Sequence, residues 1–555
     1  MRKPQPTSPI DPGPGGSSGH GILGSNRRKK RPVLFILLLP SAIYALGSVA
    51  IWLRGRRAQR RLWLAATSVA LLAWTSVLLI RRRIPLTAPL ALWKPKALFP
   101  AAMQLSLDVA DWQVLLALSA LVLAVILTAG ARRASTPLAD WAAILAFSAI
   151  TSFAVQAGNL LTVVIAWTIM DGFSFVYLHL VAGRGVDSSH AVAGLAWQGA
   201  SALLVVGSAV ADWSVSQAEG APLARTPVSF GLLLLAVLLR LGILPRHSFR
   251  PALSGIDEGL AAVFRLTPAA AAIAVLGRSV SGEIGGQTLD WLIAVGVVAT
   301  VVGCLRSALA SDQNWDVADF ILPCFGVGAL AASADPAQTG TILGFSAVLI
   351  LLSGGLLSLG TPRSTNHRIL LVIGASLTAG FPWSPAGRIG HALVESFAAG
   401  GPPWAGVLGA LGLAVLSWRL LRTAAQPAGG KPGGERFAQA AHTGGVLLLI
   451  LLGPLVAGIA WPPTSPQALL LFAVSFSIAA GLALGLRGSA EHRPVVWGRR
   501  LGRLDLRTLV RTLDLLRAKG EGVLRVIGRT LEGEAAMLWI LVVLLFVFLA
   551  LGFPG

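Results

Sequence analysis

Two shortages in this 555-residue sequence narrow its class. It has only two cysteines, Cys304 and Cys324, both in apolar runs, so neither a disulfide framework nor a cysteine metal site can be built. Charged residues make up 12% of the chain, against 55% hydrophobic residues and a mean hydropathy of +0.73. A soluble protein of this length needs more charge on its surface. The composition predicts an all-α polytopic membrane protein.

Motifs for cofactors and nucleic acids are lacking as well. No Gly-rich phosphate loop or soluble domain stands out, so we expect no cofactor, and any redox chemistry would belong to another chain. The net charge of +21 does not indicate a nucleic-acid partner, because Lys and Arg cluster in short loops and one amphipathic stretch beside apolar helices. The expected partner of this charge is the lipid bilayer.

The apolar runs of spanning length set the predicted architecture. Sixteen are found, at 33–53, 62–80, 102–130, 138–157, 159–182, 190–212, 229–245, 259–277, 288–309, 316–333, 339–360, 368–383, 402–422, 443–461, 466–486 and 536–553. Most Lys and Arg lie in loops after odd-numbered spans, which marks these loops as cytoplasmic and both termini as external. The basic stretch NRRKKR before the first span argues for the opposite orientation.

One stretch before the last span is amphipathic rather than apolar. Arg503, Arg507 and Arg511 recur every four residues between leucine stripes, which predicts a helix lying in the membrane surface. It would serve as an anchor or as a lateral strap that braces neighbouring helices or subunits. The predicted organisation is a disordered basic tail, N-terminal helices, a translocating core, C-terminal helices, a lateral helix and a final span, at 1–32, 33–130, 131–400, 401–486, 487–535 and 536–555.

The candidate functional residues are charges inside apolar spans. Arg240 lies in a Leu-rich run five residues before Pro245, and Asp171 is the acid deep in the fifth span. A charge at membrane depth costs at least ~2.5 to 3.5 kcal/mol, so it persists only beside a partner or a water path. We therefore expect Asp171 and Arg240 to pair, either as a gate for protons or as a static bridge between two helices.

Further candidates lie near prolines, which end or break helices at membrane depth. His247 follows Pro245 and would relay protons near neutral pH or cap a turn. Arg265 precedes Pro268 by three residues, which predicts a second broken helix, and snorkelling to the interface is its alternative role. A third break, around FPWSP, is followed by three candidate relay residues that are otherwise interfacial: Arg388, His391 and Glu395.

Four motifs in order resemble one family. The blocks GNLLTVVIAW, Arg240 before a Pro-x-His-x-Phe-x-Pro run, GLAAVFRLTPAAAAIAVLGR and TAGFPWSPAGR resemble the antiporter-like, proton-conducting subunits of respiratory complex I, multisubunit Na⁺/H⁺ antiporters and membrane-bound hydrogenases. The resemblance covers roughly residues 100 to 400. It implies two inverted five-helix repeats with broken helices, and it places the family's functional cations at Arg240, at or beside Arg265, and near Arg388.

Departures from the family pattern concern the ion path. Thr168 stands where the family has a glutamate, and Asp171, three residues on, is expected on the same helical face. The eleventh span lacks the expected histidine and lysine, and the tenth opens with Asp316 and Asp319 where basic residues are usual. Arginine at 240 cannot realistically lose its proton as a lysine can.

Three functions remain open from the sequence. The first is a proton- or cation-translocating subunit of a complex I related assembly in a bacterial-type inner membrane, with other membrane subunits as partners. The second is a structural member of that family that no longer conducts ions. The third is a component of a transporter for an ion such as bicarbonate.

Overall fold

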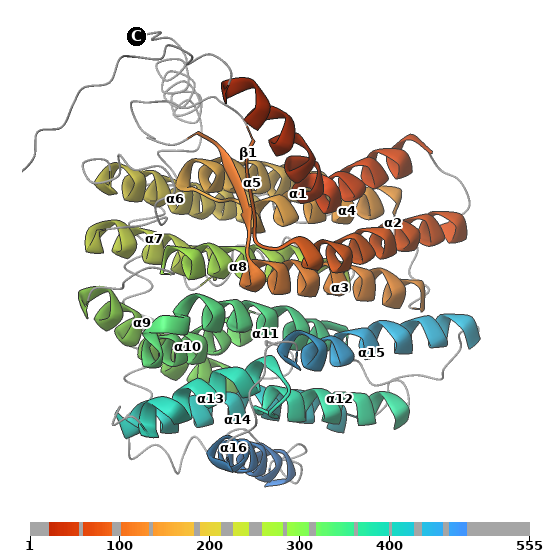
Figure 1. Ribbon diagram of the computed structural model, residues 1–555. Coiled ribbons are helices and arrows are strands. Elements are labelled where there is room, and N and C mark those ends of the chain that lie inside the picture. Colours follow the sequence, from red (N-terminus) through yellow and green to blue (C-terminus); the bar gives the residue numbers. More distant parts are fainter. Residues whose placement is uncertain are drawn as a thin grey trace, which may run out of the picture.

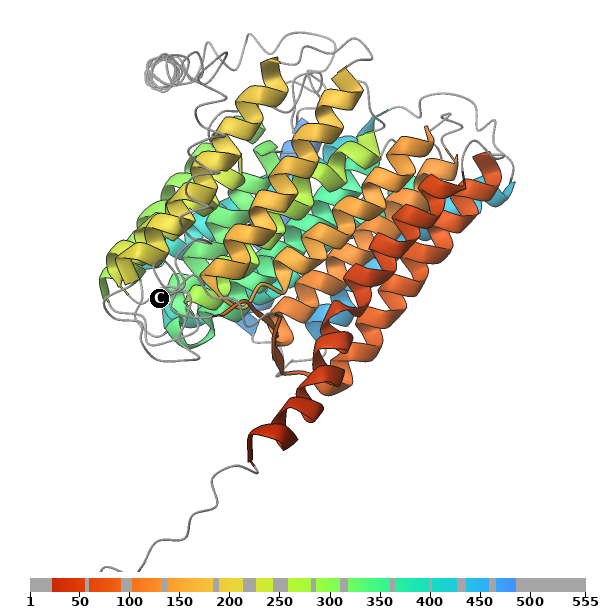
Figure 2. The same ribbon diagram turned by 90° about the horizontal axis from the view of Figure 1, so that it is seen from above.

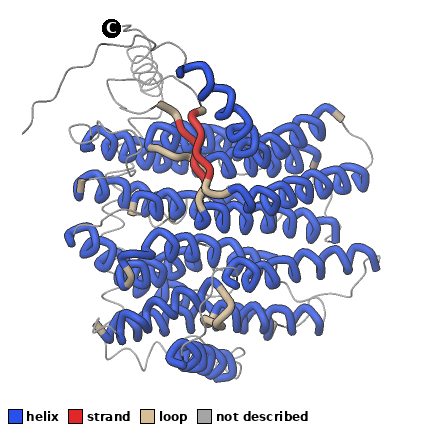
Figure 3. The backbone as a smooth tube through the Cα atoms, in the orientation of Figure 1, coloured by secondary structure: helices blue, strands red, loops and turns tan. Residues whose placement is uncertain are grey.

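The computed structural model describes residues 22–54, 59–90, 102–131, 137–182, 189–212, 226–242, 258–280, 286–309, 318–359, 365–398, 402–426, 436–458 and 466–485. Most of these residues are helical (Figure 3). The helices in this part of the chain are α1 (Ile22–Leu53), α2 (Gln59–Ile80), α3 (Val109–Ala131), α4 (Leu138–Val155), α5 (Leu160–Ala182), α6 (Ser189–Asp212), α7 (Pro227–Arg240), α8 (Glu258–Ser279), α9 (Gly286–Leu309), α10 (Ala318–Ala334), α11 (Thr339–Leu359), α12 (Thr365–Thr378), α13 (Pro385–Ala398), α14 (Pro403–Ala425), α15 (Arg436–Gly458) and α16 (Pro466–Gly485).

The helices form one bundle with roughly parallel axes (Figures 1 and 2). Twelve of the described helices are long and apolar enough to cross a membrane, and α7, α10 and α12 are shorter apolar helices. The chain is therefore a multi-pass helical membrane protein, as the composition predicts. Each of the first fifteen predicted spans coincides with one helix, and α13 is the additional one. The predicted lateral helix at 499–531 and the span at 536–553 lie outside the described residues.

A two-stranded hairpin crosses one end of the bundle, and the sequence did not predict it (Figure 3). Strand β1 (Leu86–Pro89) pairs antiparallel with β2 (Gln104–Leu107), with Leu86 opposite Leu107. The predicted span at 102–130 was therefore wrong at its start, because alternate residues of β2 face the core with period two and the helix begins only at Val109. We call this side of the bundle the hairpin end. Helices α1, α3 and α5 end at the opposite side of the bundle.

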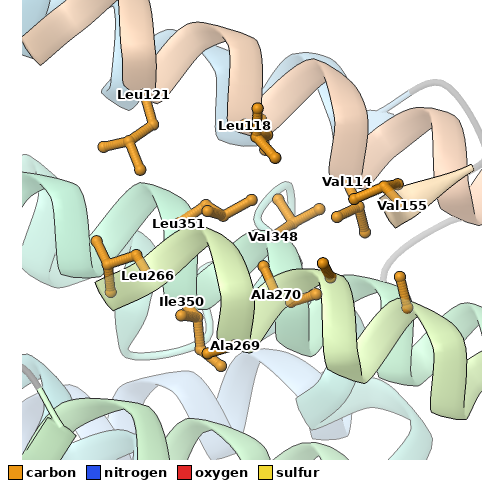
Figure 4. Packing of buried hydrophobic residues seen from close by; sticks show 14 of the residues in the cluster. Val114, Leu118, Leu121, Val155, Leu266, Ala269, Ala270, Val348, Ile350 and Leu351 are labelled. Atoms are coloured by element: carbon orange, nitrogen blue, oxygen red, sulfur yellow. The ribbon is translucent and has the colours of Figure 1, made fainter. Parts of the chain in front are cut away.

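Three helices form the centre of the bundle. Within their spanning windows, 94% of α3 and 89% of both α8 and α11 are buried, against 17% of α16, so these three face protein and α16 faces outward. Their contact surface is made of interlocking Leu, Val, Ile and Ala side chains (Figure 4). Gly354 on α11 admits the side chain of Leu266 from α8, the close approach that small residues allow between membrane helices.

Two helices end inside the bundle rather than at its surface. Helix α7 ends at Arg240, and a turn follows in which Gly242 has φ of 74°. Helix α12 ends at Thr378, and α13 begins at Pro385 after a turn in which Gly380 has φ of 102°. A left-handed backbone suits glycine, which has no Cβ to clash. The break at FPWSP is confirmed, whereas Pro245 lies outside the described residues.

The predicted break at Pro268 is wrong. Pro268 lies inside α8, which runs without interruption from Glu258 to Ser279. A proline inside a helix removes one N–H donor, and a membrane helix tolerates this loss when neighbouring groups satisfy the released carbonyl. Arg265 therefore sits on a continuous, central helix and is half-buried.

Candidate functional site: a buried acid–base pair and its neighbours

Helix α5 presents a tryptophan and an aspartate on one face. Trp167 and Asp171 are one turn apart, and both are buried, at 0% and 3% exposure. Thr168 is exposed and donates its hydroxyl to the Val164 carbonyl, so the expectation that Thr168 and Asp171 share a face was wrong. Three residues along a helix correspond to about 300° of rotation, and the boundary between the buried and exposed faces falls between them.

Helix α7 carries Arg240, the partner of Asp171. Thr226 caps its start by accepting a hydrogen bond from the Ser229 N–H, and its last residue is Arg240. The sequence pattern placed Arg240 well inside a longer helix. The helix instead ends there, because the turn at Leu241 and Gly242 closes it with hydrogen bonds to the carbonyls of Val237 and Leu239. Arg240 thus lies at the end of α7, where no further helical turn fixes the backbone that follows it.

Asp171 and Arg240 meet as predicted. Arg240 Nη1 donates to Asp171 Oδ1 at 2.8 Å and Nη2 donates to Oδ2 at 2.6 Å, while the Arg240 and Asp171 side chains are 1% and 5% exposed. Two parallel bonds between a guanidinium and a carboxylate are among the strongest hydrogen bonds in proteins. The Arg240 guanidinium also lies over the Trp167 ring, 4.1 Å from its centroid. The arrangement holds a cation and an anion inside an apolar helix bundle.

Two donors beside this pair lack acceptors. The Nε atom of Arg240 and the Nε1 atom of Trp167 are buried and have no hydrogen-bond partner among the described residues. Buried N–H groups nearly always have a partner in the protein or in ordered water. Within the described residues, the two donors are thus unsatisfied polar groups of the side chains that form the ion pair and its cation–π contact.

Helix α8 brings an aromatic cluster to the same half of the bundle. Phe264, next to Arg265, stacks on Tyr177 of α5 at 4.8 Å between ring centroids and on Phe147 of α4 at 4.3 Å. The Tyr177 hydroxyl donates to the carboxylate of buried Asp140 at 3.1 Å. Asp140 was not among the predicted site residues, although its position at the start of the fourth apolar span was a usable signal.

The three candidates that follow the break between α12 and α13 lie together on α13. His391 Nε2 is 3.5 Å from Glu395 Oε1, and the Arg388 guanidinium lies 5.7 Å from the centroid of the Phe345 ring on α11. The His391 side chain is 10% exposed, whereas that of Glu395 is 60% exposed. We call these three residues the α13 cluster. It borders different helices from the Asp171–Arg240 pair, and His247 lies outside the described residues.

Two further polar pairs were missed because their members are far apart in sequence. Asp111 of α3 accepts from Arg278 of α8 at 3.3 Å, beside a cavity of about 320 Å³ at the hairpin end that also reaches the start of α11. His367 of α12 and His442 of α15 are in hydrogen-bond contact at the opposite end. No group of three or more His, Cys, Asp or Glu side chains is placed to hold a metal ion in the described ranges.

Comparison with known proteins places the fold. Neither a protein-family model nor a curated protein matches the sequence. Among solved structures, a chain of the membrane-bound sulfane sulfur reductase, an archaeal respiratory membrane complex, matches with a TM-score of 0.61 and 13% identity, over 93% of this chain and 100% of that chain. A chain of the Mrp complex from Dietzia sp. DQ12-45-1b matches with a TM-score of 0.62 and 16% identity, over 94% of this chain and 63% of that chain.

A chain of respiratory complex I from Thermus thermophilus, solved with bound aureothin, matches with a TM-score of 0.57 and 20% identity, over 75% of this chain and 97% of that chain. The chain thus shares the fold of these chains from membrane complexes, and the resemblance predicted from the motifs is confirmed at the level of the fold. At these identities the likeness concerns architecture, so function has to be argued from the residues.

Proposed function

We propose that this chain is an antiporter-like subunit of a membrane assembly related to complex I, and that it translocates protons or another cation across a bacterial-type plasma membrane. The observation that carries this proposal is the Asp171–Arg240 pair, with side chains 5% and 1% exposed at the end of a helix that stops inside the bundle. Ionisable residues at membrane depth are costly and mark ion paths by default. The shared fold with subunits of respiratory and Mrp complexes supports the same class.

The chemistry of the pair assigns each partner a role. Arginine keeps its proton at any accessible pH, so a proton that enters the pair resides on the Asp171 carboxylate. Protonation neutralises Asp171 and removes most of its attraction for Arg240. The guanidinium can then move with the turn at Leu241 and Gly242, while α5 stays intact. In this proposal Arg240 is the gate and Asp171 the carrier, with water at the Arg240 Nε and Trp167 Nε1 donors.

Other residues extend the proposed path. Arg265 on α8 and His247 after the α7 break belong to the half of the path that contains Asp171. The α13 cluster of Arg388, His391 and Glu395 belongs to the other half. Two inverted five-helix repeats within residues 131–400, one containing α7 and the other α12, would relate the halves, which is consistent with both helices ending inside the bundle.

A structural role without conduction is the second candidate, and one observation favours it. Helix α11 is 89% buried in its spanning window and contains no titratable side chain between Thr339 and Leu359. A path through the centre of the bundle would lack a proton carrier on this helix. Under this candidate the Asp171–Arg240 pair is a static bridge between α5 and α7.

The experiment is proton transport by the assembly reconstituted in vesicles with an internal pH-sensitive dye. Asp171→Asn keeps the shape but loses the negative charge, so transport should fall by at least about a hundredfold if Asp171 carries the proton. Asp212→Asn is the matched control, because Asp212 is equally buried but accepts hydrogen bonds from the backbone N–H and hydroxyl of Thr226, at the opposite end of α7 from Arg240. Normal transport by assembled Asp171→Asn protein would refute conduction through the pair.

A further inference from the structure

Two histidines from distant parts of the chain meet at the opposite end of the bundle from the hairpin. His367 lies in the first turn of α12 and His442 in the second turn of α15, and they are 3% and 6% exposed. The separation between His442 Nε2 and His367 Nδ1 is 3.2 Å, and the ring centroids are 4.5 Å apart at an angle of 51°. We call them the histidine pair. Both are buried titratable groups that the Asp171–Arg240 gate does not use.

The geometry of the pair limits the number of protons it holds. A neutral imidazole has one N–H donor and one acceptor nitrogen, so two neutral rings share one hydrogen at this contact. One added proton makes a single cation in which an N–H donates to the other ring. A second added proton would place two positive charges and two donors 3.2 Å apart, which is unfavourable. The pair therefore behaves as one unit that takes up one proton.

The surrounding charges do not hold that proton permanently. Helices α3, α11, α13 and α14 pack on α12 or on α15, which also pack on each other. At this end of these helices, the charged side chains that the structure describes are arginines: Arg368 of α12, which donates to the Gln426 carbonyl, and Arg419 and Arg422 of α14, which lie beside the Trp418 ring. The other charged groups of these helices, Asp111 of α3 and the α13 cluster, lie on segments directed toward the hairpin end. Among the described residues, no carboxylate lies at this end of these helices to hold the proton on the pair as an ion-pair partner.

One buried face of α12 runs from His367 of the histidine pair to the helix break. His367, Leu371, Ala375 and Thr378 follow at spacings of four, four and three residues and are all buried, so they line one face. This face ends at the Thr378 hydroxyl, which is 2.7 Å from the Ser353 hydroxyl of α11. The rise of about 1.5 Å per residue separates His367 from Thr378 by about 16 Å along the helix. Buried Leu371 and Ala375 separate the two polar ends of this face, so a proton that passes from the histidine pair to the α12 break and on to the α13 cluster needs water along the face.

We propose that His367 and His442 form a proton-loading pair that accepts one proton from the aqueous phase at the end opposite the hairpin and passes it toward the break between α12 and α13. The delivery step rests on the proposed translocation function, whereas uptake of one shared proton by the pair does not. Histidine suits this role because its charge changes between about pH 5 and pH 8.

The first test compares pH profiles of transport in the reconstituted assembly. His367→Gln, His442→Gln and the double variant are measured beside His179→Gln, which alters an exposed histidine at the end of α5. Each single variant should lower the rate roughly tenfold above about pH 7, where protons are scarce, and the double variant should lower it no further because the two rings act as one unit. Unchanged pH profiles, or losses that multiply in the double variant, would overturn the proposal.

The second test needs no variant. Histidine ¹⁵N chemical shifts of the unaltered assembly in lipid bilayers should show two rings that together gain one proton between about pH 5 and pH 8 and exchange it between them. Two rings that titrate independently, or that gain no proton, would overturn the proposal even if variants fail to assemble. If the unaltered assembly transports nothing while the shared proton is observed, the translocation function fails and the uptake site stands.

Discussion

The guanidinium of Arg240 lies 4.1 Å from the centroid of the Trp167 ring, while its two terminal nitrogens bind the carboxylate of Asp171. Trp167 and Asp171 are one helical turn apart on α5, so a single face of this helix provides both partners for the cation. The aromatic ring stabilises the positive charge without adding a negative one. The charge balance between these three side chains therefore rests on Asp171.

We expect the tryptophan to contribute to stability and to the position of the guanidinium. A cation–π contact with a desolvated cation is worth about 1 to 2 kcal/mol, so Trp167→Leu should lower the melting temperature of the assembly more than Trp167→Phe, which keeps an aromatic face. The control is Trp52→Leu, because Trp52 is 66% exposed on α1. Equal melting temperatures for the two Trp167 variants would show that the ring only fills space.

Arginine and lysine should differ at position 240 in a defined way. Lysine keeps the positive charge at position 240, so we expect Arg240→Lys to retain transport. It cannot make the two parallel bonds to Asp171, so the rate should fall, but by no more than roughly tenfold. Arg240→Gln leaves the Asp171 carboxylate in an apolar interior without its cation, so transport should be lost. Vesicle assays of both variants at equal protein content check this. Equal rates for Gln and Lys would show that the charge at 240 is not needed.

Close helix packing gives a prediction for the second half of the bundle. A Cβ added to Gly326 of α10 would collide with the backbone nitrogen of Thr300 on α9, whereas a Cβ added to Gly172 meets nothing within 4 Å. Overpacking against a backbone cannot be relieved by a rotamer change and costs about 1 to 3 kcal/mol or more. Gly326→Ala should reduce the yield of assembled protein, and Gly172→Ala, although adjacent to Asp171, should not. Similar yields for the two variants would contradict the close backbone contact between α9 and α10.

The helical spans could be predicted from the sequence, because each is a long apolar run with its own signal. The meeting of Asp171 and Arg240 was also predictable, because two opposite charges in apolar helices have few other solutions. The end of α7 at Arg240 was not, since the apolar residues after it continue the helical pattern. The hairpin was missed because β2 directly adjoins the apolar run of α3.

The histidine pair could not be predicted from the sequence. His367 and His442 are separated by 75 positions, and each alone is typical of a polar residue near the end of a span. Only the packing of α12 against α15 brings their rings together. The same holds for Asp111 and Arg278, 167 positions apart, which meet because α3 and α8 are neighbours at the centre of the bundle.

In the proposed function the Asp171–Arg240 pair takes part in proton conduction and does more than brace α5 against α7. The most direct measurement is a double-mutant cycle of Asp171→Asn and Arg240→Gln, in which thermal stability and proton transport are recorded on the same reconstituted assemblies. Removing one partner of a buried pair costs about 3 to 5 kcal/mol because the other charge is stranded, so both single variants should lose stability and the double variant should regain much of it. We expect that the double variant, although stable again, transports no protons. Normal transport by the stable double variant would contradict conduction through the pair.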